Sequence, residues 1–158
     1  MLTGDALAVA SEIARGVGLP NIRRVADLKA ASTQAGNEAV DVLAGTDGFA
    51  EVYPEDKYLV VQHLQAAGHV TGMTGDGVND APALRQAEVG IAVSTATDVA
   101  KGAASVVLTE PGLTNILALV EQGRTIYQRI LTWIINKISR TILKAAFVAI
   151  AFVVTGKF

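Results

Sequence analysis

The stretch Met73-Thr74-Gly75-Asp76-Gly77-Val78-Asn79-Asp80-Ala81-Pro82-Ala83-Leu84 decides the fold of this chain. It places the carboxylates of Asp76 and Asp80 four residues apart and sets Gly75 and Gly77 beside them. Glycines let backbone amides approach an anion closely, and carboxylate oxygens suit Mg2+. The stretch therefore predicts a glycine-rich turn that holds Mg2+ and a phosphate, although Asp-Gly and Asn-Asp also form ordinary structural turns.

Outward from this turn, short strands and helices alternate. Apolar patterning predicts strands at residues 49–53, 69–74, 89–93 and 105–108. It predicts helices at 6–17, 54–67 and 97–103, and a short helix that follows the glycine-rich turn and ends near residue 86. We expect Asp5 to cap the first helix. Residues 21–48 are polar and poorly patterned, so we expect a loop-rich insert with one short helix near 37–43.

This alternation of strands and helices, joined by short connections, predicts an α/β fold with a parallel sheet and flanking helices. Ligands in such folds bind beyond the carboxyl ends of the strands. Thr74-Gly75-Asp76 lies at the end of the strand predicted at 69–74. We expect the chain to open at the end of another buried strand, so Thr3-Gly4-Asp5 also lies at a strand end. Thr3 and Lys57 are candidates to hydrogen-bond and neutralise a phosphoryl group, although a lysine near a helix start is usually a solvated one.

Composition and charge divide the chain of 158 residues in two. It contains no cysteine, which excludes disulfides, thiolate metal sites and thiol nucleophiles. Residues 1–122 hold 15 acidic and 7 basic side chains, whereas residues 123–158 hold 6 basic and no acidic ones. This asymmetry indicates a membrane or nucleic-acid contact at the basic end. The basic residues are spread beside an apolar run and form no recognition motif, so we expect no nucleic acid.

The basic part reads as helix. Residues 113–154 form one very long helix or two with a joint near Gly123. Residues 145–154 are all apolar, which is half of the roughly 20 residues needed to span a bilayer. Lys137, Arg140 and Lys144 share a helix face, which is typical of a solvated face near anionic headgroups.

Three motifs carry a resemblance to a known family. The twelve-residue stretch resembles the hinge motif of the P-type cation-transporting ATPases, Thr3-Gly4-Asp5 resembles their TGD motif, and residues 53–57 (Tyr-Pro-Glu-Asp-Lys) resemble the segment with their essential lysine. The resemblance implies a haloacid-dehalogenase-like, Rossmann-like phosphorylation domain at 1–112. It also implies stalk helices at 113–144 and the beginning of a transmembrane helix at 145–158.

The resemblance also implies roles for single residues. Asp76 resembles the Mg2+ ligand, and Asn79 and Asp80 resemble residues that hold the metal and phosphate site together. Lys57 resembles the lysine that contacts the phosphoryl group. Thr3 and Gly4 resemble its neighbours on the other side, and Asp5 resembles the aspartate close to the bound ATP. Mg2+ is thus the implied cofactor and ATP the implied substrate.

The family's phosphorylated aspartate lies in a DKTGT motif that this chain lacks, so we expect the segment alone to be inactive and its partner to be the missing remainder of the pump. The full protein is expected to be a multi-pass protein of the cell membrane, with residues 1–112 cytoplasmic. The segment 108–113 (Leu-Thr-Glu-Pro-Gly-Leu) resembles the proton-pump branch, which favours H+ as the transported cation. A second hypothesis gives Lys144 a fixed charge near the transport path. The alternatives are a Ca2+ or Mg2+ pump, a soluble haloacid-dehalogenase-type phosphatase, and a non-catalytic truncated module.

Overall fold

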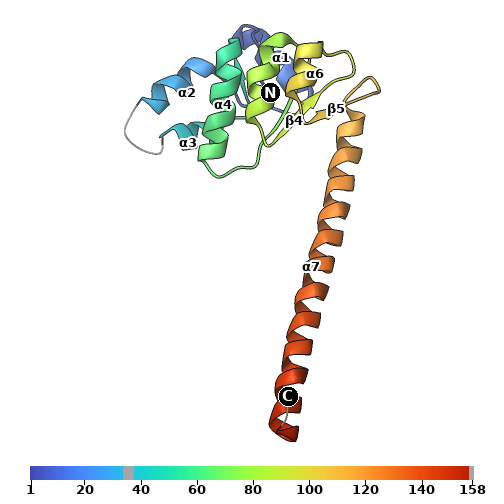
Figure 1. The fold of residues 1–158 in the computed structure, drawn as a ribbon. Helices are drawn as coiled ribbons and strands as arrows, with labels where there is room; N and C mark the ends of the chain where they lie inside the picture. Colours follow the sequence, from blue (N-terminus) through green and yellow to red (C-terminus); the bar gives the residue numbers. More distant parts are fainter. Residues whose placement is uncertain (34–37, 157–158) are drawn as a thin grey trace. The chain divides into compact units, whose positions relative to one another are not determined.

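The computed structural model describes residues 1–33 and 38–156. These form two compact units, Met1–Gly112 and Leu113–Phe158, which are described here one at a time. The first unit alternates strands and helices, and the second is one helix (Figure 1).

The second half of the first unit is a parallel sheet covered by short helices. Its strands are β3 (Gly72–Gly75), β4 (Val89–Ala92) and β5 (Val106–Val107), in the order β3-β4-β5. Met73 pairs with Gly90, and Ile91 pairs with Val106. The 3-10 turn η1 (Val78–Asp80) and the helices α5 (Ala81–Gln86) and α6 (Asp98–Ala103) connect these strands. One apolar cluster forms the core of this half: Val61, Met73, Ala83, Leu84, Ala87, Ala92, Ala96 and Ala100.

The first half of the unit has its own small parallel sheet. Strand β1 (Ile22–Arg24) pairs with β2 (Gly48–Ala50), and Leu2 forms an isolated parallel bridge to Phe49. The helices of this half are α1 (Leu7–Gly16), α2 (Val25–Ser32) and α3 (Glu38–Ala44). A second apolar cluster forms the core here: Val25, Leu28, Phe49, Val52 and Val60.

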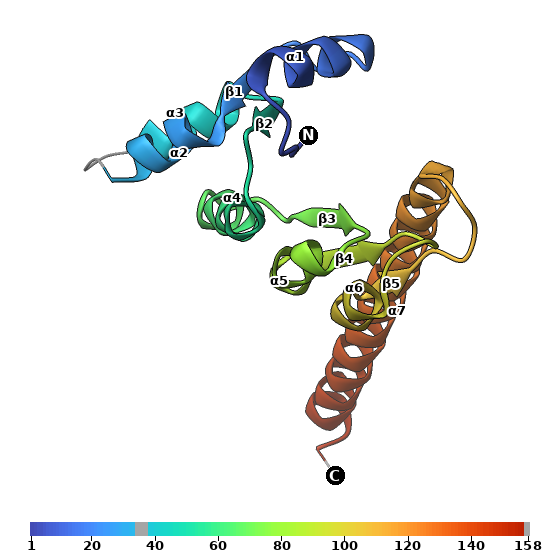
Figure 2. The same ribbon diagram turned by 90° about the horizontal axis from the view of Figure 1, so that it is seen from above.

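Helix α4 (Pro54–Ala66) lies between the two halves (Figure 2). It begins with Pro54, because a proline at the first helical position gives up only an amide hydrogen that has no intrahelical acceptor. Val60 belongs to the cluster with α2 and β2, whereas the next residue, Val61, belongs to the cluster with β3 and β4. Successive residues thus bury their side chains in different cores.

Most of the predicted elements are confirmed, with three corrections. The expectation of a loop-rich stretch at 21–48 is wrong, because β1 and α2 lie there, although α3 confirms the short helix. The predicted cap is also wrong, because Ala6 is the N-cap of α1 and Asp5 bonds to Thr3 instead. The strands form two parallel sheets and not one.

The second unit is the helix α7 (Thr114–Thr155), 42 residues long. It continues through Gly123, so the version with one helix is confirmed over the version with a joint. It ends at Gly156, whose φ of 62° is the left-handed conformation common after helices. By length and composition α7 is able to cross a membrane.

Candidate functional site

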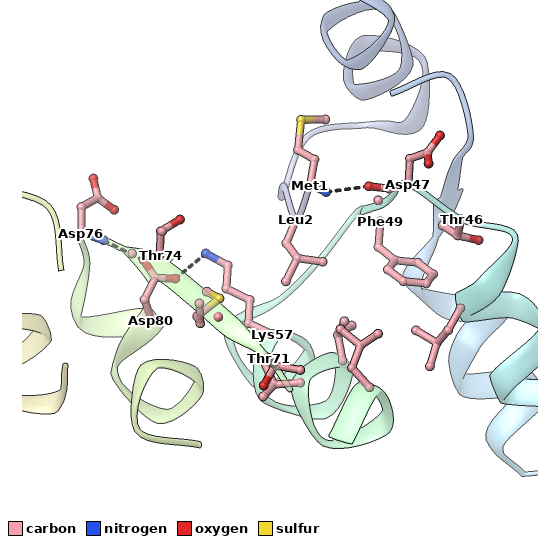
Figure 3. Close-up of a pocket in the computed structure, with 18 of the residues that line it drawn as sticks. Met1, Leu2, Thr46, Asp47, Phe49, Lys57, Thr71, Thr74, Asp76 and Asp80 are labelled. Atoms are coloured by element: carbon pink, nitrogen blue, oxygen red, sulfur yellow. Dashed lines mark hydrogen bonds and ion pairs between the residues drawn. The ribbon is translucent and has the colours of Figure 1, made fainter. Parts of the chain in front are cut away.

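The candidate site lies at the carboxyl end of β3, where the chain turns through residues 74–80. Lys57, from the first turn of α4, reaches into this turn, and its Nζ lies 2.6 Å from Oδ1 of Asp80. Figure 3 shows Lys57 extending toward Asp80 while the Asp76 carboxylate points away from both. The structure therefore brings three of the predicted site residues together at one strand end.

Asp80 is the fixed point of the turn. Its side chain is 6% exposed, and its Oδ2 accepts hydrogen bonds from the amides of Asp76 and Gly77, both at 3.2 Å. Gly75 allows this approach, because a Cβ on it would lie 2.5 Å from the Cβ of Asp80. The glycines of the stretch thus serve the packing of an aspartate within the turn.

The charge state of Asp80 follows from these contacts. Burial alone raises the pKa of its carboxyl. The hydrogen bond and charge of Lys57 and the amides of Gly77 and Asp76 lower that pKa by more than burial raises it. The net pKa lies below the ordinary value for an aspartate, so Asp80 is ionised at neutral pH. Lys57, with 23% of its side chain exposed, still presents part of its surface to solvent beside this fixed anion.

Asp76 offers the oxygen chemistry that Mg2+ needs. Its backbone is held on both sides, because its amide donates a hydrogen bond to Oδ2 of Asp80 and its carbonyl accepts one from the amide of Thr97 at 2.9 Å. Within the described ranges, no hydrogen bond or ion pair occupies its exposed carboxylate, and no group of three acidic or histidine side chains forms a metal cluster. Mg2+ binds to one or two carboxylates and keeps several waters or phosphate oxygens. Asp76 therefore fits one ligand of a magnesium site whose other ligands come from substrate or solvent.

Asn79 lies elsewhere. It is exposed and lines a shallow hollow with Pro54, Tyr58 and Pro82, separate from the cavity that Lys57, Asp76 and Asp80 line. The predicted role of Asn79 at the metal and phosphate site stays a prediction.

Thr3, Gly4 and Asp5 follow the Leu2 bridge in the first half of the unit. The Thr3 hydroxyl donates to Oδ2 of Asp5 at 2.7 Å, and the Asp5 amide donates back to Thr3 Oγ1 at 3.2 Å. The Thr3 amide and carbonyl bond to Phe49 and Val52, which ties this loop to β2. Among the described residues, no hydrogen bond joins this group to Lys57 or Asp80, so its predicted role stays a prediction too.

A cavity of about 650 Å3 separates Leu2 and Phe49 from β3 (Figure 3). Met1 and Thr3 bond to β2, so the backbone groups of Leu2 face the opposite way, by the alternation of a parallel ladder. Thr71 and Gly75 accept hydrogen bonds from the β4 side, which leaves the backbone groups of Gly72 and Thr74 on the open edge of β3. Among residues 1–33 and 38–156, two strand edges whose backbone groups have no strand partner thus border one slot. Lys57, Asp76 and Asp80 line the same cavity.

Two polar features around the site were not predicted. Asp56 is 1% exposed and pairs with Lys29 of α2. Glu88 accepts hydrogen bonds from the amide and hydroxyl of Thr71 and from Gln65, which ties the start of β3 to the loop before β4. No sequence spacing indicates either contact, because each joins residues 17 or more positions apart.

Comparison with known proteins gives matches over most of the chain. A family model described as haloacid dehalogenase-like hydrolase matches residues 1–88. A protein of Methanocaldococcus jannaschii named as a cation-transporting ATPase is 44% identical over 160 residues. That match covers 99% of this chain and 20% of the archaeal protein, so the chain spans about a fifth of the relative's length.

Solved structures match as well. The catalytic domain of the CPx-ATPase CopB-B, studied for its conformational changes upon nucleotide binding, is 25% identical with a TM-score of 0.54. The match covers 75% of this chain and 37% of that one. A zinc-transporting PIB-type ATPase in its E2.Pi state is 35% identical with a TM-score of 0.51, over 60% of this chain and 16% of that one.

Proposed function

Because the chain belongs to the haloacid dehalogenase-like hydrolase family and is homologous to cation-transporting ATPases, we propose that it forms part of a P-type cation pump. Residues 1–112 are the C-terminal part of the phosphorylation domain, 113–144 the stalk, and 145–158 the beginning of a transmembrane helix. The observation that carries the proposal is the Lys57–Asp80 pair at the end of β3, beside the exposed carboxylate of Asp76.

Each residue of the site has a role in this proposal. Lys57 contacts the phosphoryl group and neutralises part of its charge, and Asp80 fixes both Lys57 and the turn. Asp76 holds Mg2+, which when bound neutralises phosphate charge and orients the phosphoryl group. Thr3 and Gly4 contact the phosphoryl group from the other side, Asp5 lies near ATP, and Asn79 supports the metal site.

The slot between Leu2 and β3 supports the same proposal. An extended segment that pairs with both open edges joins the two sheets into one parallel sheet. In the pump, this segment is the strand that ends in the DKTGT aspartate, and its carboxylate emerges at the strand end beside Lys57 and Asp76. Transfer of the phosphoryl group to that aspartate and then to water divides the hydrolysis of ATP into two steps. The chain alone lacks the aspartate and is therefore inactive.

The proposal for the transported ion rests on the segment 108–113 and not on the site. The segment 108–113 favours H+ by its resemblance to the proton-pump branch. The relatives with solved structures are instead named as a CPx-ATPase and a zinc-transporting ATPase, and the archaeal relative only as cation-transporting. We keep proton export as the first assignment and another metal cation as its competitor. The test measures whether the full pump in sealed vesicles transports H+ or instead Zn2+ or Ca2+. Transport of H+ supports the first assignment, and transport of a metal cation supports its competitor.

The membrane assignment rests on α7. Its hydropathy admits a membrane span, and its basic residues precede the apolar run 145–154, as expected of a helix that enters the bilayer from the cytoplasm. We therefore assign residues 1–112 to the cytoplasm and the full protein to the cell membrane. A soluble phosphatase is not expected to carry the apolar run 145–154, so this run favours the pump over that alternative.

The decisive experiment is done on the longer protein. Sequencing the DNA upstream of codon 1 is expected to reveal an in-frame DKTGT motif. Radiolabelled ATP is then expected to leave an acid-stable, hydroxylamine-sensitive label on the full protein and none on residues 1–158. Lys57→Met and Asp76→Asn are each expected to reduce that label strongly, whereas Lys101→Met in α6 is the control with an unchanged label. Labelling of the isolated chain, or full labelling of both site variants, contradicts the proposal.

A further inference from the structure

Asp56 is a buried carboxylate with both oxygens engaged. Its Oδ1 lies 2.5 Å from Nζ of Lys29, and its Oδ2 accepts the amide hydrogen of Tyr53 at 3.0 Å. A buried charge is costly unless it is paired, so these two contacts fix the side chain. One contact leads to α2 and the other to the residue that precedes α4. The first turn of α4 is thereby attached to the first half of the unit.

Lys57 follows Asp56 directly and points to the other half. Successive helical residues project about 100° apart, so the two side chains leave the same turn in different directions. Lys57 pairs with Asp80 at 2.6 Å, while Asp56 pairs with Lys29. One turn later the same division recurs, with Val60 in the α2 cluster and Val61 in the β3 cluster. The position of Lys57 is therefore coupled to that of Asp56 through a single rigid turn.

From this arrangement we propose that Lys29 is a positioning residue for Lys57. Its ion pair with Asp56 fixes the rotation of the first turn of α4 about the helix axis and its position along that axis. This places the Lys57 amine within reach of Asp80. Lys29 does not touch the reacting groups. Its importance for catalysis rests on the proposed function of Lys57, but its effect on the geometry of Lys57 does not.

The geometric arm of the test uses the chain itself in mild detergent. Limiting acetic anhydride competes for all lysine amines, and mass spectrometry gives the reactivity of Lys57 relative to Lys101. Lys29→Met is expected to raise this ratio by about threefold or more, because a Lys57 amine released from its 2.6 Å contact with Asp80 is more open to the reagent. Lys29→Arg keeps the charge and is expected to leave the ratio near the wild-type value. An unchanged ratio in Lys29→Met overturns the proposal.

A second variant covers the case in which Lys29→Met does not fold. Asp56→Asn removes the charge that Lys29 meets and keeps an oxygen for the Tyr53 amide, so it is expected to raise the Lys57 ratio as well. If Asp56→Asn is folded and its ratio is unchanged, the proposal is overturned. Glu55→Gln, one residue earlier on the exposed side of the same turn, is the matched control and is expected to change nothing.

The functional arm uses the full pump. Lys29→Met is expected to lower the amount of hydroxylamine-sensitive label, and Lys29→Arg to restore it. If Lys57 reactivity rises in Lys29→Met and the label does not fall, the positioning of Lys57 stands and the role proposed for Lys57 fails. If neither changes, the positioning itself fails.

Discussion

Gly75→Ala is the substitution for which the structure makes the sharpest prediction. The added methyl would lie 2.5 Å from Cβ and 2.8 Å from Cγ of Asp80. Carbon atoms in contact normally lie about 3.5–4.0 Å apart, so Asp80 or the strand must move by about 1 Å. A shift of this size takes the two 3.2 Å bonds from the amides of Asp76 and Gly77 beyond hydrogen-bonding range.

The cost has two parts. Overpacking a tight site costs about 1–3 kcal/mol. Weakening hydrogen bonds to a charged, buried group adds about 1.5–3 kcal/mol. We expect Gly75→Ala to lower the free energy of unfolding of residues 1–112 by the sum of the two, about 2.5–6 kcal/mol.

Gly72→Ala in the same strand is the matched control. The nearest atom to its added Cβ is the Val89 carbonyl oxygen at 3.9 Å, an ordinary contact. Both glycines have φ outside the left-handed region, so both variants share the gain that alanine brings by restricting the unfolded chain.

Urea unfolding of the chain in mild detergent, read by brief proteolysis and mass spectrometry of peptides from 72–92, gives the difference. If Gly75→Ala unfolds within about 0.5 kcal/mol of Gly72→Ala, Asp80 does not pack against the β3 backbone as described.

Three further predictions concern stability and solubility. The pKa of Glu88 is lowered to about 2 by its hydrogen bonds from Thr71, so Glu88→Gln is expected to lower the urea midpoint by a constant amount above about pH 5. That difference should vanish as the pH falls toward 2, and a pH-independent difference contradicts the assignment. Leu28→Ala removes a fully buried side chain and is expected to cost about 2–5 kcal/mol in urea unfolding read on peptides from 22–32 and 48–52, against less than about 0.5 kcal/mol for the exposed Val70→Ala read on peptides from 72–92. The isolated chain exposes open strand edges and an apolar helix, so it is expected to form oligomers without detergent; a monodisperse monomer in sedimentation speaks against this.

The fold could be predicted where the local signal is strong. The predicted haloacid dehalogenase-like parallel α/β fold is confirmed, because turn glycines, Pro54 and short apolar runs mark the elements of the second half clearly. The stretch 21–48 was misjudged because α2 has only eight residues, and three buried ones, Val25, Leu28 and Ala31, make too short a pattern. Strand β1, which precedes α2, has only three residues and none of them is buried, so a search for apolar periodicity does not detect this strand.

The candidate site could be predicted only in part. The residue types of the turn indicated Asp76 and Asp80, and the segment before the predicted helix indicated a phosphate-neutralising Lys57. The structure brings these three to one strand end. The spacing 57 to 80 by itself does not predict a 2.6 Å contact, because the path of α4 and β3 in space sets it. Lys29 carries no signal at all in the sequence, because its partner lies on another helix and only tertiary packing brings them together.

The division of α4 between two apolar clusters has a consequence for folding cooperativity. Among the described residues, the two clusters are distinct, and Val60 and Val61 are the adjacent positions at which they meet. Residues 1–52 and 72–108 are therefore two candidate foldons, each able to open without exposing the other's core. Native-state hydrogen exchange should then show two levels of amide protection in the chain. Those levels should merge into one when an upstream strand fills the slot, because a shared ladder of backbone hydrogen bonds makes the two halves unfold together.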